Sequence, residues 1–199
     1  MYEVRYFFAV MMLVTVPSAI GLWYLIHPFA AFWRRFGAAL TYTILAVPTG
    51  AFMWATWRVR DTLLARDLGW SPALTAVSVG LVIIGGVIAQ KRRKLLTQRI
   101  LLGVPELSST DRGHLLTTGI YARVRNPWYL EFIFFILGYV AFANFMGTWI
   151  LFVLILPATH LLVLMEEREL RDRFGAEYED YCRQVPRWIP RRPPGIPAS

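Results

Sequence analysis

Two polar stretches of the chain, residues 113–131 and 166–190, contain the side chains whose types and spacing could do chemistry. In the first stretch, Arg125 is followed by Asn126 and Pro127, and a long apolar run begins directly after them. Proline suits the first turn of a helix, and asparagine suits the position before it. A helix that begins here presents unpaired N–H groups beside an arginine, an arrangement that binds a carboxylate or a phosphate. The alternative is that the asparagine only caps the helix and the arginine only anchors it.

The second stretch begins with three carboxylates at the end of another apolar run, and helical spacing distinguishes them. Glu167 has Arg171 four residues later and Glu169 has Arg173 four residues later, so both acids have an ordinary explanation as surface ion pairs. Glu166 has no cationic residue three or four positions away on either side. An acid at the depth of a membrane span is costly and usually serves a site. We therefore expect Glu166 to be functional. For Glu167, a surface ion pair and a functional role both remain open.

Aromatic residues follow these acids. The helix that carries the acids is expected to run to Phe174 and to stop at Gly175. Tyr178, Tyr181 and Trp188 then occur at spacings that suit a short amphipathic helix lying at a membrane interface. Alternatively, one or two of these rings cover a cationic ligand, because aromatic faces attract sulfonium and ammonium groups.

The elements that must position these residues are strongly apolar. The chain has 199 residues, of which 56% are hydrophobic and 17% are charged. Soluble domains contain about 45–50% apolar and about 25% charged residues. The composition therefore argues against a soluble enzyme, a disordered protein or a disulfide scaffold. Cys182 is the single cysteine, and His27, His114 and His160 are too scattered in the sequence to suggest a metal site.

Five segments are apolar enough to be membrane-spanning helices, which need roughly 20 residues each. They are residues 6–26, 37–57, 71–90, 128–143 and 148–165. The first is too long for a signal peptide and lacks a clear cleavage site, so we expect it to be retained. Only residues 144–147 separate the last two, which favours an antiparallel hairpin. The sequence thus predicts an all-α polytopic membrane protein of about five transmembrane helices with a C-terminal helical hairpin.

Basic residues orient this predicted bundle. Most of the 21 lysines and arginines fall on the side opposite the link at residues 144–147, including the cluster Lys91–Lys94. The excess of positive charge on cytoplasmic segments then places the N-terminus outside and the C-terminus in the cytoplasm, in what we expect to be a bacterial inner membrane. The cluster Lys91–Lys94 is expected to contact anionic headgroups. The net charge of +8 therefore indicates membrane topology rather than nucleic-acid binding.

Two motifs carry a family resemblance. GxYxxVRNPxY begins at Gly119, and EExxLxxxFGxxYxxYxxxVPRWIP begins at Glu166. In this order, on either side of an apolar hairpin, they resemble the membrane-embedded S-adenosylmethionine-dependent methyltransferases. That superfamily includes isoprenylcysteine carboxyl methyltransferase and bacterial phospholipid-methyltransferase-like proteins, and the resemblance covers residues 113–190. Eukaryotic prenylcysteine members usually have histidine at the position of Asn126, so asparagine there resembles the bacterial branch. Glu131 occupies a position where a small residue is expected.

The resemblance implies an enzyme that binds S-adenosylmethionine with its cytoplasmic elements. It would methylate a lipophilic or membrane-borne acceptor, such as an isoprenylcysteine-type carboxylate, a phospholipid amine or another small lipophilic molecule. The chain would form one methyltransferase domain, with three spans in residues 1–90, the cofactor-binding region in residues 91–190 and a tail in residues 191–199. Methyl transfer from a sulfonium mainly requires that donor and acceptor be aligned.

The charged residues of the motifs have expected roles in holding the cofactor. Arg125, together with the helix start at Asn126 and Pro127, would hold the carboxylate of the methionine part. Glu166 and Glu167 would bind its ammonium group or the ribose hydroxyls. Because Glu166 is the deepest of these acids, it is also the first candidate for a catalytic residue.

The remaining predicted site residues are aromatic or small, with one further acid. Tyr121, Tyr129 and Tyr178 would pack around the adenine or the sulfonium. Gly119 would allow close approach of the backbone. Glu131 is the second catalytic candidate, because an amine acceptor needs a base to remove its proton, whereas a carboxylate acceptor needs little base catalysis.

Other functional classes remain open from the sequence. A membrane sterol or steroid reductase would bind NADPH, whose phosphates could contact Arg123, Arg125 and the cluster Lys91–Lys94. A non-enzymatic scaffold or a transporter is the third class. Transport is disfavoured because the spans contain only scattered Thr, Ser and Asn. No GxGxxG motif follows a strand-like run, which argues against a soluble nucleotide-binding fold.

Overall fold

The computed structural model describes residues 1–96 and 114–190, which are mostly helical. In chain order the helices are α1 (Tyr2–Ile26), η1 (His27–Phe29), α2 (Ala30–Trp33), α3 (Gly37–Arg58), α4 (Arg60–Leu63), α5 (Pro72–Arg93), η2 (Gly119–Ala122), α7 (Pro127–Ala143), α8 (Met146–Phe174) and α9 (Ala176–Gln184). The predicted tail at residues 191–199 lies outside the described residues, as does the segment 97–113 of the predicted cofactor-binding region.

Four segments of the described chain are long and apolar enough to cross a membrane. They are α1 continued through α2, then α3, α5 and α8. The fifth predicted span corresponds to α7, which is apolar but has only 17 residues. At 1.5 Å per residue it is roughly 26 Å long, slightly less than the roughly 30 Å hydrocarbon core of a bilayer. The all-helical class is therefore confirmed, with four candidate spans and one shorter apolar helix.

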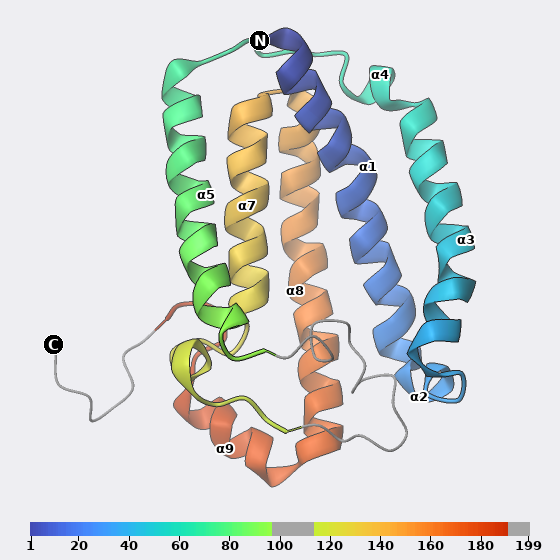
Figure 1. Ribbon diagram of the computed structural model, residues 1–199, viewed down its shortest axis with the longest axis vertical. Helices are drawn as coiled ribbons and strands as arrows, with labels where there is room; N and C mark the ends of the chain where they lie inside the picture. Colours follow the sequence, from blue (N-terminus) through green and yellow to red (C-terminus); the bar gives the residue numbers. More distant parts are fainter. Residues whose placement is uncertain (97–113, 191–199) are drawn as a thin grey trace, which may run out of the picture.

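The long helices lie side by side in the order α5, α7, α8, α1 and α3 (Figure 1). Helix α5 packs most extensively against α7, whereas α1 contacts α3, α7 and α8. Helices α7 and α8 run antiparallel, as the short link predicted. The N-terminus and the α7–α8 link lie at one end of the bundle, and α9, η2 and the start of α7 lie at the other, which we call the α9 end (Figure 1).

Close packing of α5 against α7 depends on glycine. A Cβ atom at Gly138 would lie 3.0 Å from Val82 Cγ2 and 3.3 Å from the carbonyl oxygen of Ser78. A Cβ atom at Gly85 would lie 3.2 Å from the ring of Phe135. Interiors packed this tightly have little room for an added methyl group. The interface therefore fixes the end of α5 beside the start of α7.

The α7–α8 link is held by one asparagine in the left-handed conformation. Asn144 has φ 51°, its side-chain amide donates to the carbonyl oxygen of Gly69 at 2.8 Å, and its Oδ1 accepts from the Trp149 indole at 3.1 Å. Asparagine tolerates this conformation better than most residues do. Arg5 adds a hydrogen bond to the carbonyl oxygen of Ala143 at 3.0 Å. These contacts lock the end of the bundle opposite α9.

The chain turns sharply after α8. As predicted, α8 ends at Phe174 and Gly175 follows with a positive φ of 56°. The short helix α9 then places Tyr178 and Tyr181 in a buried cluster with Val185. Hydrogen bonds tie this region back to the loop before α7, because the Tyr181 hydroxyl donates to the carbonyl oxygen of Tyr121 at 2.8 Å.

Candidate functional site

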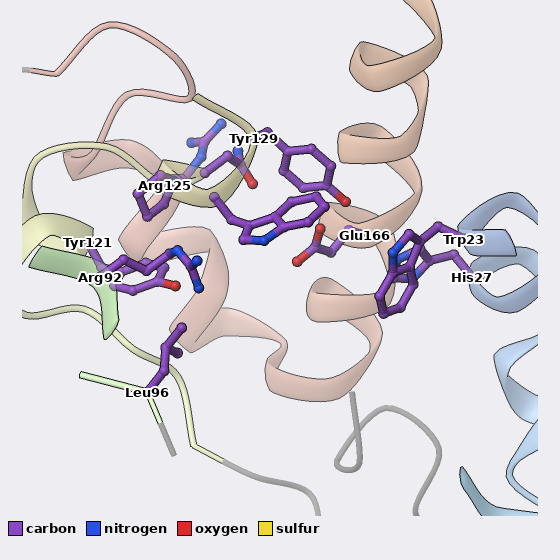
Figure 2. Close-up of a pocket in the computed structure, with 11 residues that line it drawn as sticks. Trp23, His27, Arg92, Leu96, Tyr121, Arg125, Tyr129 and Glu166 are labelled. Carbon is purple, nitrogen blue, oxygen red and sulfur yellow. The ribbon is translucent and has the colours of Figure 1, made fainter. Parts of the chain in front are cut away.

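A cavity at the α9 end is formed by elements that are far apart in the sequence. Its walls come from α1 and η1, from the end of α5 and the residues after it, from η2, from the start of α7 and the residues before it, and from one residue of α8 (Figure 2). The lining residues are Trp23, His27, Arg92, Leu96, Tyr121, Arg125, Asn126, Pro127, Trp128, Tyr129 and Glu166. Six of the predicted site residues are therefore brought together in one cavity: Tyr121, Arg125, Asn126, Pro127, Tyr129 and Glu166.

The start of α7 faces this cavity without a side-chain cap. Asn126 precedes the helix, but its side chain makes no capping hydrogen bond. Its amide donates instead to Glu167 Oε1 at 3.1 Å. The first-turn N–H groups of α7 therefore keep the positive character of a helix N-terminus where Pro127, Trp128 and Tyr129 line the cavity. Asn126 therefore occupies the N-cap position, as the sequence predicted, but its side chain does not cap the helix.

Arg125 contributes a buried donor to the same wall. Its Nη1 donates to the carbonyl oxygens of Cys182 and Val185, at 2.9 and 3.2 Å. Its Nη2 lies 3.3 Å from Glu167 Oε1. Its Nε is buried and has no acceptor among the described residues. A buried donor without an acceptor is costly, so a ligand oxygen at this position would be strongly favoured.

Glu166 reaches the cavity from α8, and no basic side chain is close to it on its own helix. Tyr129 hydrogen-bonds to its carboxylate, and His27 is close enough to interact with it electrostatically. Figure 2 shows Glu166 between Tyr129 and the pair formed by Trp23 and His27. The cavity thus has a carboxylate from α8 and a cationic wall at the start of α7.

Glu167 is not among the residues that line the cavity, and its side chain joins three segments of the chain. Its side chain is fully buried. It accepts hydrogen bonds from Arg187 at 2.7 and 3.0 Å and from Asn126 at 3.1 Å, and it pairs with Arg125 at 3.3 Å. The helical neighbour Arg171 is more distant, at 3.8 Å. Glu167 therefore holds the start of α7 and the segment after α9 against α8, rather than forming a surface pair.

Two more predicted cofactor residues, Gly119 and Tyr178, are not among the residues that line the cavity. Gly119 has φ 61°, and a Cβ atom there would lie 2.7 Å from Leu95 Cδ1, so glycine is needed for the turn into η2. Tyr178 is 1% exposed and packs against Tyr181. Burial raises the pKa of both phenols. Among the predicted tyrosines, Tyr121 does line the cavity, and burial raises its pKa to about 12.

Glu131 forms a buried ion pair with Arg92 between α7 and α5. Its two carboxylate oxygens accept from Arg92 Nε at 2.9 Å and from Arg92 Nη2 at 3.1 Å. Of the two partners, the guanidinium lines the cavity and the carboxylate does not. Arg92 also departs from the predicted headgroup anchor Lys91–Lys94, because its side chain is only 4% exposed.

Five lining residues were absent from the predicted site: Trp23, His27, Arg92, Leu96 and Trp128. One signal in the sequence could have pointed to the first two. With one span before His27, the end of α1 must lie on the same side of the bundle as the start of the fourth predicted span. Spacing within one helix does not reveal which helices are neighbours, so the contact itself could not be foreseen.

Comparison with known proteins identifies the family. Residues 74–177 match the phospholipid methyltransferase family. Over 88 residues the chain is 36% identical to protein-S-isoprenylcysteine O-methyltransferase of Schizosaccharomyces pombe, a match that covers 43% of this chain and 37% of that enzyme. It is 30% identical over 131 residues to a probable protein-S-isoprenylcysteine O-methyltransferase of Oryza sativa subsp. indica, covering 65% of this chain and 68% of that protein. No solved structure matches the chain. The resemblance inferred from the two motifs is confirmed, and the chain belongs to the phospholipid methyltransferase family of membrane methyltransferases.

Proposed function

We propose that the protein is an integral membrane methyltransferase that moves a methyl group from S-adenosylmethionine to a lipophilic or lipid-borne acceptor. The observation that carries the proposal is the polarity of the cavity. One wall contains the start of α7, which has no side-chain cap, and the Nε of Arg125, which has no acceptor among the described residues. The carboxylate of Glu166 reaches the same cavity from α8. Membership of the phospholipid methyltransferase family supports it independently.

The residues present fit the amino-acid part of S-adenosylmethionine. Its carboxylate would accept from Arg125 Nε and from the first-turn N–H groups of α7, which satisfies the buried donor. Glu166 would accept from its ammonium group or from the ribose hydroxyls. Tyr121, Trp128 and Tyr129 offer aromatic faces in the same cavity for the adenine or the sulfonium. Glu167 would act indirectly, by holding Asn126 and Arg125 in place.

The chemistry needs few protein groups. When bound, the cofactor supplies an electrophilic methyl carbon on a sulfonium. The cavity residues orient donor and acceptor for in-line displacement and exclude water, and this alignment is the main protein contribution. The role of Glu131 as a base for an amine acceptor stays a prediction. Glu131 pairs with Arg92 and is not among the residues that line the cavity.

We also infer how the chain lies in the membrane. Five crossings, with α7 as the shortest, would put the N-terminus outside and the α9 end in the cytoplasm, where most of the basic residues lie. The protein would lie in the inner membrane of a bacterium. The chain would form a single domain over residues 1–199. The acceptor would be an isoprenylcysteine-type carboxylate, a phospholipid amine or another small lipophilic molecule.

Calorimetric binding to the detergent-purified protein tests the proposal. S-adenosylmethionine and S-adenosylhomocysteine should bind, and NADPH should not. Glu166→Gln keeps the side-chain shape but removes the charge, so affinity should fall about tenfold to a hundredfold. Glu177→Gln, at an exposed acid of α9, is the matched control and should bind as the native protein does. Binding of NADPH alone would instead support a reductase, and full affinity in the Glu166 variant would remove that residue from the site.

A further inference from the structure

A groove between α5 and α7 lies apart from the cavity, near the α9 end of the bundle. Helix α5 stands at the edge of the row of long helices, with α7 as its neighbour (Figure 1). The residues that line the groove are Gly86, Ala89, Gln90, Arg93, Lys94 and Phe135. None of them lines the cavity, to which the same part of the chain contributes Arg92 and Leu96. The groove is therefore a separate surface feature, and the proposed methyl transfer does not use it.

The deeper part of the groove is an apolar slot, formed by Gly86, Ala89 and Phe135. A Cβ atom at Gly86 would have nothing within 4 Å among the residues that the structure describes. The neighbouring Gly85 differs, because a Cβ atom there would lie 3.2 Å from the ring of Phe135. Phe135 is thus held against α5 at Gly85, and the slot beside it stays open at Gly86. Because the core of a bilayer contains no water, lipid chains fill such a slot.

The outer part of the groove is a basic rim, formed by Gln90, Arg93 and Lys94. Helix α5 ends at Arg93, and all three side chains of the rim are exposed. Among the described residues that line the groove, two are cations and none is an acid. Basic residues in a last turn also complement the helix dipole, but that role needs no groove beside them. A phosphate at the rim would meet two counter-charges and an amide donor.

The rim and the slot follow each other along α5 in the way that a phospholipid requires. From Gly86 to Lys94 the helix rises roughly 12 Å, at about 1.5 Å per residue. The span predicted from the sequence ends at residue 90, so the rim lies at the membrane interface and Gly86 lies at the depth of the acyl chains. Basic pockets between membrane helices at this level bind anionic headgroups.

We propose that the α5–α7 groove is a binding site for an anionic phospholipid, whose phosphate contacts the basic rim and whose acyl chain lies in the slot. This lipid is distinct from the methyl acceptor, because the groove and the cavity share no lining residue. Its effect is on the fold, since it holds the last turn of α5, which also carries Arg92 to the cavity. The inference depends on the membrane location of the chain and not on the proposed reaction.

Titration of the detergent-purified protein with phosphatidylglycerol, followed by native mass spectrometry, tests the rim. The first phosphatidylglycerol should bind more tightly than phosphatidylcholine, whose headgroup has no net charge. Arg93→Gln and Lys94→Gln should each weaken this binding about fivefold, and the double variant about 25-fold. Lys91→Gln is the matched control, because Lys91 is exposed near the same end of α5 but does not line the groove. It should weaken binding by about twofold or less.

The variant Gly86→Leu tests the slot without changing any charge. Leucine would occupy the space that the acyl chain needs, so the first phosphatidylglycerol should bind about tenfold more weakly. Gly80→Leu is the matched control, because Gly80 is an equally open glycine of α5 outside the groove. Both replacements favour a helix, so both proteins should fold, which circular dichroism checks.

Thermal unfolding gives a second measure of the same site. A ligand that binds only the folded protein raises its Tm. Phosphatidylglycerol should therefore raise the Tm above its value in phosphatidylcholine for the native protein and for both control variants. The increase should be smaller in the rim and slot variants.

Four results would overturn the inference. They are no preference for phosphatidylglycerol, equal losses in Lys91→Gln and Arg93→Gln, native affinity in Gly86→Leu, and displacement of the lipid by millimolar inorganic phosphate. The second would show a general attraction of basic residues to anionic lipid, and the last would show binding of the phosphate group alone. None of these results depends on S-adenosylmethionine, whose failure to bind would be the failure of the proposed function instead.

Discussion

Removal of the Glu131 charge should destabilise the protein strongly. Both carboxylate oxygens of Glu131 accept from Arg92, and the two side chains are 9% and 4% exposed. Glu131→Gln leaves the guanidinium buried without its counter-charge, which costs about 3–5 kcal/mol when one partner of a buried pair is lost. At about 2–4 °C per kcal/mol for a chain of this size, the apparent Tm should fall by about 6–20 °C. Thermal unfolding in detergent, followed by circular dichroism, measures it.

A double variant separates a structural pair from a catalytic base. Arg92→Met combined with Glu131→Leu replaces the pair by apolar side chains of similar volume and should recover most of the lost Tm. If Glu131 acts as a base instead, Glu131→Gln would lower methyl transfer while leaving the Tm unchanged. An unchanged Tm in the single variant, or a double variant that is no more stable than the single one, would refute the ion-pair reasoning.

Two further predictions concern the end of the bundle opposite α9. A Cβ atom at Gly147 would lie 2.1 Å from the carbonyl oxygen of Leu63, so Gly147→Ala should cost about 1–3 kcal/mol of stability in thermal unfolding. Partial burial of Asp67 tends to raise the pKa of its carboxyl group. Hydrogen bonds from Arg5 and from the Gly69 N–H, together with the charge of Arg5, outweigh burial and lower the pKa of Asp67 below the usual value of an aspartate. The carboxylate therefore stabilises the fold above about pH 4, and this contribution should be lost as pH falls through the folded-state pKa.

Each of these predictions has a control. Gly86→Ala places its methyl group where nothing lies within 4 Å, so it should leave the Tm near the native value. A loss in Gly86→Ala equal to that in Gly147→Ala would show that clash is not the cause. Asp67→Asn should remove the part of the acid dependence that this carboxylate causes, seen as a flatter plot of Tm against pH. An acid dependence identical in both proteins would contradict the assignment to Asp67.

The sequence was informative where the signal was local. Three predictions depended only on residues within one or two helical turns. They are the helix stop at Gly175, the lack of a basic neighbour for Glu166 on its own helix, and the helix start at Pro127. The structure has the helix boundaries as predicted and places Glu166 in the cavity. Apolar length likewise predicted the helical class, although α7 is shorter than a full span.

Prediction was weaker where partners came from distant segments. Helical spacing suggested Arg171 as the partner of Glu167, but the buried carboxylate is held mainly by Arg187 and Asn126. The pairing of Glu169 with Arg173 is present at 3.7 Å, yet His27 and Arg34 contact the same acid from the N-terminal part of the chain. These contacts depend on which helices are neighbours, and one helix's own periodicity does not contain that information.

Arg92 illustrates the same limit. In the sequence it is one of four consecutive basic residues after an apolar span, a pattern typical of a headgroup anchor. Its neighbours Lys91, Arg93 and Lys94 are exposed, as that pattern predicts. Arg92 differs because the helical rotation directs it toward α7, where Glu131 supplies the charge that makes burial tolerable.

The structure of the protein bound to S-adenosylhomocysteine tests the central claim most directly. The ligand should occupy the cavity at the α9 end. Its carboxylate should lie within hydrogen-bond distance of Arg125 Nε and the first turn of α7, with its amino group or ribose beside Glu166. A ligand bound outside this cavity, or bound in it with its carboxylate beside Glu166, would contradict the account.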